Sequence, residues 1–184
     1  MRTASQSTTD GTTTMSTSLD LEDLPVYGYP GPVFYAIHVT AIVCLTISIL
    51  TSAGVLLYLL LYNDRSKVKF FKRPIGERLV VYLALCDLFF SIAHELDHTY
   101  MLTTKDHPPD RLCIFFAFFV QNFILAQALL VIFTALSTMI LVLFEKKVHL
   151  GRFDWRLISF TFGIPTVNGI VGSLVPYLGQ SGAW

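Results

Sequence analysis

The sequence is poor in charge and in cysteine, and each shortage excludes a class of protein. Only 14% of its 184 residues are charged, whereas 53% are hydrophobic. A soluble domain of this length could not bury so much apolar surface, so the composition indicates a membrane protein. Three cysteines are too few for a secreted domain held together by disulfide bonds. The net charge is zero, and we expect no nucleic-acid partner.

Residues 1–24 lack the apolar side chains that dominate the rest of the chain. Eleven Ser or Thr lie between residues 3 and 18, and a small acidic cluster follows at Asp20, Glu22 and Asp23. Such a segment cannot bury enough apolar surface to offset the loss of chain entropy, so we predict a disordered tail. No basic start precedes an apolar run here, which argues against a cleavable signal peptide.

Residues 25–184 contain four long apolar runs, which we expect to form one transmembrane domain. The runs cover about 33–62, 79–101, 113–144 and 157–178. Each exceeds the ~20 helical residues that cross a ~30 Å hydrocarbon layer. None alternates like a barrel strand, and backbone groups in lipid must be paired within the segment. The predicted fold class is therefore an all-α membrane protein with four transmembrane helices. A soluble helical bundle would need a polar stripe on each helix, and the first and third runs have none wide enough.

Basic residues are concentrated in two of the three loops between these runs. The first loop holds six Lys or Arg and the third holds four, which together are ten of the thirteen in the chain. Cytoplasmic loops carry an excess of Lys and Arg, so these two loops are predicted to be cytoplasmic. The amino terminus and the last residues then lie outside the cell. We expect a multi-pass protein of the plasma membrane, embedded in the lipid bilayer.

The second run carries many ionisable side chains for a membrane segment. Asp87, Ser91, His94 and His98 are spaced by 4, 3 and 4 residues and therefore share one helix face. An ionisable group that faces lipid is costly, so this face is predicted to point at other helices or at water. Candidate partners are polar or small residues of the later runs: Gln127, Thr134 and Thr138 in the third, and Asn168, Gly169, Gly172 and Ser173 in the fourth. The alternative is that these polar groups only hydrogen-bond the helices together.

Residues 94–98 also match H-E-x-x-H, the signature of zinc proteases. That chemistry needs two neutral histidines one turn apart, a glutamate base, a third ligand and an open water position. His38 could supply a third imidazole, but the longer H-x-x-G-x-x-H extension and a third carboxylate are missing. An integral-membrane zinc hydrolase that uses His94, Glu95 and His98 is therefore an alternative hypothesis only. We expect no enzyme activity, no cofactor and no bound metal.

Five features resemble the amino-terminal half of a seven-helix G-protein-coupled receptor. The second run contains LALCDL, close to the L-x-x-x-D pattern around a buried aspartate of that family, here Asp87. The third run opens with Cys113, where these receptors place one end of their extracellular disulfide. That run is also long, because its 32 residues would make a helix of about 48 Å.

The fourth run and the last residues supply the other two features. Trp155 and the FGIP of residues 162–165 are similar to the G-W-G-x-P of secretin, adhesion and cAMP-receptor-like receptors. The sequence closes with SGAW, and in those groups a similar G-x-W is followed by C-W-I, whose cysteine pairs with the third helix. The likeness covers four of seven helices and is nearest to these groups. Unlike rhodopsin-like receptors, the first run lacks Gly-Asn and the third ends near Glu145 without Asp-Arg-Tyr.

The resemblance implies a receptor that passes the signal of an unknown extracellular ligand to a heterotrimeric G protein by rearranging its helices. It implies a ligand site formed by His94, Glu95, Asp97, His98, Gln121 and Asn122, and an activation network of Asp87, Gln127 and Thr134. Cys113 would either pair with a cysteine beyond Trp184 or remain free. The histidines at 94 and 98 would make activation sensitive to pH. Because four helices lack the rest of the pocket and of the G-protein cleft, we expect residues 1–184 alone not to signal.

A four-span membrane scaffold of the junction type is a third hypothesis. Such a protein would function with four helices alone. These scaffolds usually keep both termini in the cytoplasm, whereas the basic loops predict that both termini of this chain lie outside.

Overall fold

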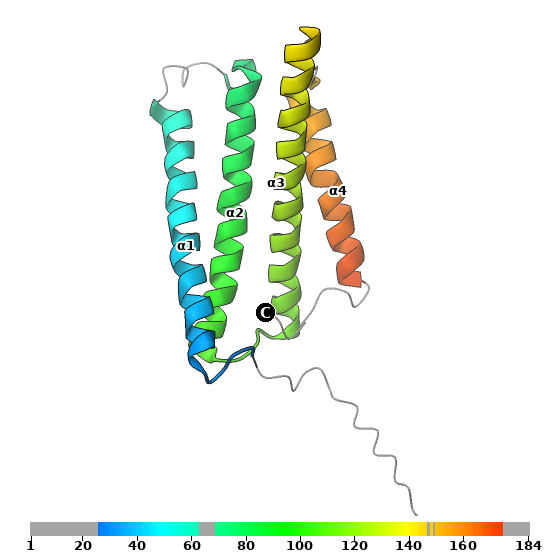
Figure 1. Cartoon of the computed structure of the whole chain (residues 1–184). Coiled ribbons are helices and arrows are strands. Elements are labelled where there is room, and N and C mark those ends of the chain that lie inside the picture. Colours follow the sequence, from blue (N-terminus) through cyan, green and yellow to red (C-terminus); the bar gives the residue numbers. More distant parts are fainter. Residues whose placement is uncertain (1–25, 63–68, 147, 149, 175–184) are drawn as a thin grey trace, which may run out of the picture.

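The computed structural model describes residues 26–62, 69–146, 148 and 150–174 (Figure 1). Within these residues the chain is helical and contains no strand: α1 (Pro32–Leu57), α2 (Ile75–Thr104), α3 (Asp110–Phe144) and α4 (Trp155–Leu174). A π-helical turn, η2 (Tyr58–Tyr62), extends α1, and two 3₁₀ turns, η4 (Phe70–Lys72) and η5 (Arg152–Asp154), precede α2 and α4. The predicted tail of residues 1–24, the loop residues Arg65, Lys67 and Lys147, and the SGAW motif lie outside the described residues.

The four helices stand side by side in chain order and alternate in direction (Figure 1). Each is long and apolar enough to cross a membrane, over 30, 30, 35 and 20 residues. The prediction of four long apolar helices is therefore confirmed, and the chain has the character of an all-α, multi-pass membrane protein. We name the two ends of the bundle from Figure 1: α1 and α3 begin at the lower end, and α2 and α4 begin at the upper end.

Two helices begin earlier than their apolar runs predict, and proline is the reason. Pro74 precedes α2, which begins at Ile75 rather than Leu79, and Pro109 precedes α3, which begins at Asp110 rather than Cys113. Proline has no N–H to leave unpaired at a helix start and its φ suits one, so helices readily begin beside it. At its other end α2 stops where Lys105 adopts a left-handed conformation, with φ of 60°.

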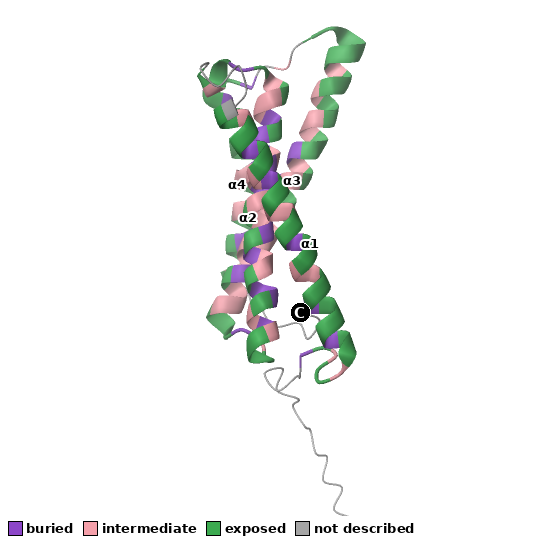
Figure 2. Ribbon diagram, turned by 90° about the vertical axis from the view of Figure 1, so that its left-hand side faces the viewer, coloured by how far each residue is buried: buried purple, intermediate pink, exposed green. Residues whose placement is uncertain are grey.

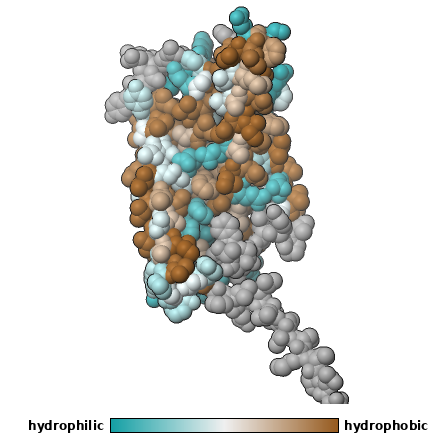
Figure 3. All heavy atoms as spheres, in the orientation of Figure 1, coloured by the Kyte–Doolittle hydropathy of each residue, from teal (hydrophilic) through white to brown (hydrophobic). Residues whose placement is uncertain are grey.

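Most large apolar side chains of the bundle point outward rather than into a core. Exposed positions dominate α1, and purple buried residues run along the contacts between helices (Figure 2). The main buried cluster joins α2, α3 and α4 through Leu79, Tyr82, Cys86, Ala126, Leu130, Leu150 and Leu157. The face drawn in Figure 3 is mostly hydrophobic, with hydrophilic side chains at mid-height across the middle of the bundle. An apolar exterior of this kind suits lipid as the surrounding solvent.

The packing of α3 against α4 depends on a glycine. A Cβ atom added at Gly169 would lie 2.7 Å from the Phe118 ring, which is closer than real atoms approach. Small residues allow such close contact between membrane helices. One polar bond accompanies this contact, because the Thr166 hydroxyl donates to the Asn122 side-chain oxygen at 3.1 Å.

Candidate functional site

A pair of histidines joins α1 to α2 near the lower end of the bundle. The Nδ1 atoms of His38 and His98 lie 2.8 Å apart, and both residues are buried. In such a bond one ring donates its Nδ1–H and the other accepts it, so the two rings hold opposite roles. The Phe34 ring packs against His38 at 4.4 Å between centroids, and the His94 ring packs edge-on against His98 at 4.6 Å.

A glutamate and a threonine form the next contact along the same two helices. The Thr46 hydroxyl lies 2.9 Å from Glu95 Oε1 and 2.8 Å from the carbonyl oxygen of Ile42. A hydroxyl has a single proton, so Thr46 divides it between the carboxylate on α2 and its own helix. This bond turns Glu95 toward α1.

Asp87 forms a third contact between α1 and α2, farther from the lower end of the bundle than those of His98 and Glu95. Its Oδ2 atom accepts hydrogen bonds from two serines of α1: Ser48, at 2.8 Å, and Ser52. Two donors to one carboxylate oxygen satisfy much of its need for hydrogen bonds in a water-poor setting. Ser52 is buried, and Asp87 and Ser48 are half-buried.

These contacts form one continuous feature, which we call the α1–α2 polar seam. Its members are His38, Thr46, Ser48 and Ser52 of α1 and Asp87, Glu95 and His98 of α2. From His38 to Ser52 the helix rises about 21 Å at 1.5 Å per residue. The seam therefore covers about two thirds of a ~30 Å hydrocarbon layer.

The structure divides the six predicted ligand residues among three helix pairs. Glu95 and His98 bond to α1, with His94 packed beside His98. Asp97 is buried, and its carboxylate lies near enough to the Cys113 thiol of α3 to interact with it electrostatically. Asn122 accepts its bond from α4, and Gln121 is half-buried on α3.

The three residues of the predicted activation network are not bonded to one another. Asp87 bonds to α1, and in the described part of the chain no hydrogen bond links it to Gln127 or Thr134. The Thr134 hydroxyl donates to the Leu130 carbonyl of its own helix at 2.7 Å, and Gln127 is half-buried. The activation network therefore remains a prediction.

The thiols of Cys44, Cys86 and Cys113 are all free. A disulfide between Cys113 and a cysteine beyond Trp184, the first of the two alternatives for this thiol, stays a prediction. Among the described residues, no group of three or more His, Cys, Asp or Glu side chains is arranged to hold a metal ion. His98 Nδ1 faces His38 and Glu95 faces Thr46, so zinc at His98 Nδ1 would first have to displace the histidine pair.

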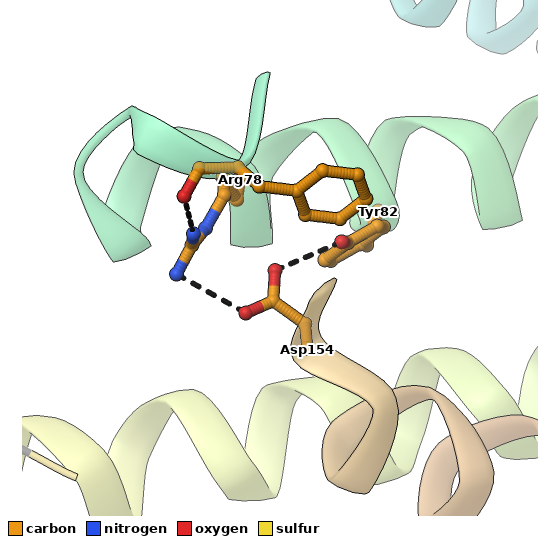
Figure 4. Close-up of polar contacts among 4 residues, drawn as sticks. Arg78, Tyr82 and Asp154 are labelled. Atoms are coloured by element: carbon orange, nitrogen blue, oxygen red, sulfur yellow. Dashed lines mark hydrogen bonds and ion pairs between the residues drawn. The ribbon is translucent and has the colours of Figure 1, made fainter. Parts of the chain in front are cut away.

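A second polar cluster lies at the upper end, where α2 begins and η5 leads into α4 (Figure 4). Arg78 Nη2 lies 3.1 Å from Asp154 Oδ1, and the Tyr82 hydroxyl donates to Asp154 Oδ2 at 3.0 Å. Arg78 also donates to the carbonyl oxygen of Phe71 at 2.5 Å. The Asp154 side chain is 1% exposed and that of Arg78 14%, so the carboxylate is buried and the guanidinium is half-buried.

Sequence reasoning missed this upper cluster. Arg78 counted only toward topology, and Asp154 was not singled out because it lies in a loop. One signal was available: Arg78 and Tyr82 are four residues apart, so they share a face at the start of α2. An acidic residue directly before the fourth apolar run is the natural partner for that face.

A surface depression of about 530 Å³ lies on α4 and is lined by Ser159, Gly163, Ile164, Val167, Asn168 and Val171. None of the predicted ligand residues lines it. No protein-family model, curated protein or solved structure matches the chain. The polar seam and the upper cluster are therefore the features of the chain that bear on its function.

Proposed function

We propose that the chain is the first part of a seven-helix receptor of the G-protein-coupled type. It lies in the plasma membrane with its amino terminus outside the cell, and it transmits an extracellular ligand signal by rearrangement of its helices. The observation that carries this proposal is the α1–α2 polar seam, with its two carboxylates and its histidine pair inside an apolar bundle.

Polar and ionisable groups at membrane depth are costly, and they usually mark a functional pathway. Apolar helices can associate mainly by close packing, as α3 and α4 do at Gly169. A seam of side-chain hydrogen bonds differs from such packing, because its donors and acceptors can exchange partners when a helix shifts. That exchange provides the two discrete arrangements on which a ligand can act through differential affinity.

The upper cluster connects this seam to the surface that would face the cytoplasm. α2 carries His98 near its lower end and Arg78 near its upper end, so one helix joins the polar seam to the upper cluster. Exposed cations lie at that upper end, at Lys69, Lys72 and Arg156. A basic surface there suits a G protein or anionic lipid, although topology alone also accounts for basic charge.

The test is G-protein activation in cells, measured as constitutive dissociation of fluorescent Gα and Gβγ subunits across the four Gα classes. Cells should express the complete open reading frame or residues 1–184 alone. We expect activity above mock-transfected cells from the complete product and none from residues 1–184. Asp87→Ala, which removes the acceptor of Ser48 and Ser52, should change that activity, whereas Thr51→Val on the exposed side of α1 should not.

Two outcomes would overturn the proposal. One is a complete product that engages no Gα class although antibody staining finds it at the cell surface. The other is an epitope tag on the amino terminus that antibodies reach only after the cells are permeabilised.

A further inference from the structure

The histidine pair differs from the rest of the polar seam because both partners can gain a proton. His38 and His98 are 4% and 8% exposed, and their Nδ1 atoms lie 2.8 Å apart. Phe34 packs on His38, and a small apolar cluster of Val26, Phe34 and Met101 lies at this end of the two helices. The pair is thus held in apolar surroundings, where a new charge is poorly solvated.

The chemistry of imidazole sets how many protons this contact tolerates. In the neutral pair, one ring donates Nδ1–H and the other accepts through the lone pair of its Nδ1. A first proton can bind the Nε2 of the donor ring and leaves the hydrogen bond intact, now assisted by charge. A second proton must occupy the accepting Nδ1. Two N–H groups and two positive charges then face each other, and the contact is lost.

Other titratable groups at this end determine how readily charge accumulates. From α2, the His94 ring touches His98, Glu95 bonds to Thr46, and Asp97 is buried. The other titratable or charged groups that the structure describes at the lower end are Tyr27 and Tyr29 before α1, Tyr35 on α1, Tyr100 on α2, Lys105, Asp106 and His107 after α2, and Asp110, Arg111 and Cys113 on α3. A positive charge on His94, whose ring touches His98, would oppose the second proton.

We infer that the His38–His98 pair is a proton-operated latch, closed with one added proton or none and opened by two. This inference deepens the proposed function, on which it rests for its role in signalling, and it names protons as a regulator of the seam. It also moves the expected pH sensitivity from His94 and His98 on one helix to a contact between two helices.

The deeper bonds of the seam determine the movement that follows. Thr46–Glu95 and the two serine bonds to Asp87 lie farther along α1 and contain no histidine. They hold the helices together while the latch opens, so the lower ends of α1 and α2 should separate and the upper ends should stay in place. This hinge-like opening exposes His94 and His98, two of the predicted ligand residues.

The experiment measures two distances by double electron–electron resonance in lipid nanodiscs, from about pH 8 down to about pH 4, because apolar surroundings make a second proton harder to add here than to a free imidazole. Spin labels at Ala36→Cys and Thr103→Cys report the lower end, and labels at Leu57→Cys and Val80→Cys report the upper end; all four positions are exposed. The native cysteines at 44, 86 and 113 are replaced. We expect the lower distance to increase by about 2 Å or more at acid pH, with the upper distance unchanged.

The variants separate the latch from general effects of acid. His38→Phe keeps a ring in the apolar site and should abolish the shift, as should His98→Phe, which serves if the first variant does not fold. His107→Gln, in the loop after α2, is the matched histidine control and should keep the full shift. A lower distance that does not respond to pH would overturn the inference, and so would a shift that survives in both phenylalanine variants. No G protein is present in this measurement, so the latch and the receptor function can fail separately.

Discussion

The α1–α2 and α3–α4 interfaces join apolar helices in different ways. α1 and α2 meet through four side-chain contacts between polar residues, which involve two carboxylates and a histidine pair. α3 and α4 meet at Gly169, where the Phe118 ring fills the space of an absent side chain, with one hydroxyl–amide bond beside it. Lipid tails are as apolar as leucine, so membrane helices associate through either close packing or hydrogen bonds.

The difference suggests a division of tasks within one small bundle. Steric packing has one good arrangement, because a ring fits a glycine or clashes with any larger residue. Hydrogen bonds between hydroxyls, carboxylates and imidazoles have several arrangements of similar energy, and protonation can select among them. The α1–α2 interface is therefore the adjustable contact, and the α3–α4 interface is the fixed one.

The largest effect is expected where α2 meets the turn that leads into α4, since this contact connects the two interfaces. Arg78→Ala leaves the Asp154 carboxylate, which is 1% exposed, buried without its cation. We expect a loss of about 3–5 kcal/mol in the free energy of unfolding. Titration with sodium dodecyl sulfate in mixed micelles measures this quantity. Arg78→Lys, which keeps the charge, should lose much less, and equal losses would contradict the role of the ion pair.

A smaller loss is expected from overpacking the fixed interface. Gly169→Leu places a side chain where even a Cβ atom would lie 2.7 Å from the Phe118 ring. Overpacking of this kind costs about 1–3 kcal/mol. Gly163→Leu on the same helix is the matched control, because a Cβ at Gly163 meets nothing within 4 Å. In the same unfolding assay Gly169→Leu should be clearly less stable than Gly163→Leu. Equal stability would show that α3 and α4 can separate without cost.

Removing the Asp87 hydrogen bonds from the α1–α2 interface should lower the free energy of unfolding less than overpacking the α3–α4 interface does. Asp87→Ala deprives Ser48 and Ser52 of their shared acceptor, and hydrogen bonds between membrane helices contribute about 0.6 kcal/mol each, with a maximum near 1.7. We expect a loss of about 1–2 kcal/mol. Asp87→Asn, which keeps an acceptor oxygen, should lose about half of that. Combined with Gly169→Leu the losses should add, because the two sites share no partner; a strongly non-additive pair would mean that the interfaces are coupled.

The helices were predictable from sequence because the bilayer imposes strict requirements on length and composition. The common face of Asp87 and His98 was also predictable, since helical spacing determines which residues share a side. That face does contact another helix, as the cost of lipid exposure requires. Only the ends of α2 and α3 were misplaced, where Pro74 and Pro109 allow the helix to begin outside the apolar run.

The partners of that face could not be derived in the same way. Spacing gives the direction of a side chain within its own helix but not the neighbour that stands there. Gln127 and Thr134 of α3 matched the pattern, whereas the actual partners of Asp87 are serines of α1. Serine and threonine in a helix carry little signal, because their hydroxyls can equally bond to the backbone of their own helix. The contact between His38 and His98 could not be predicted either, because it depends on how α1 and α2 are aligned.

The smallest effect is expected from a threonine hydroxyl, which can bond either to a neighbouring helix or to the backbone of its own helix. The Thr46 hydroxyl reaches Glu95 on α2, whereas that of Thr51 lies only near backbone oxygens of its own helix. Thr46→Val removes a bond between helices and should lower the free energy of unfolding by about 0.6 kcal/mol. Thr51→Val makes the same chemical change on α1 without breaking such a bond, so its loss should be close to zero. If the two variants are equally stable, the Thr46–Glu95 contact contributes nothing to the pairing of α1 with α2, and the polar seam reduces to its histidine and aspartate contacts.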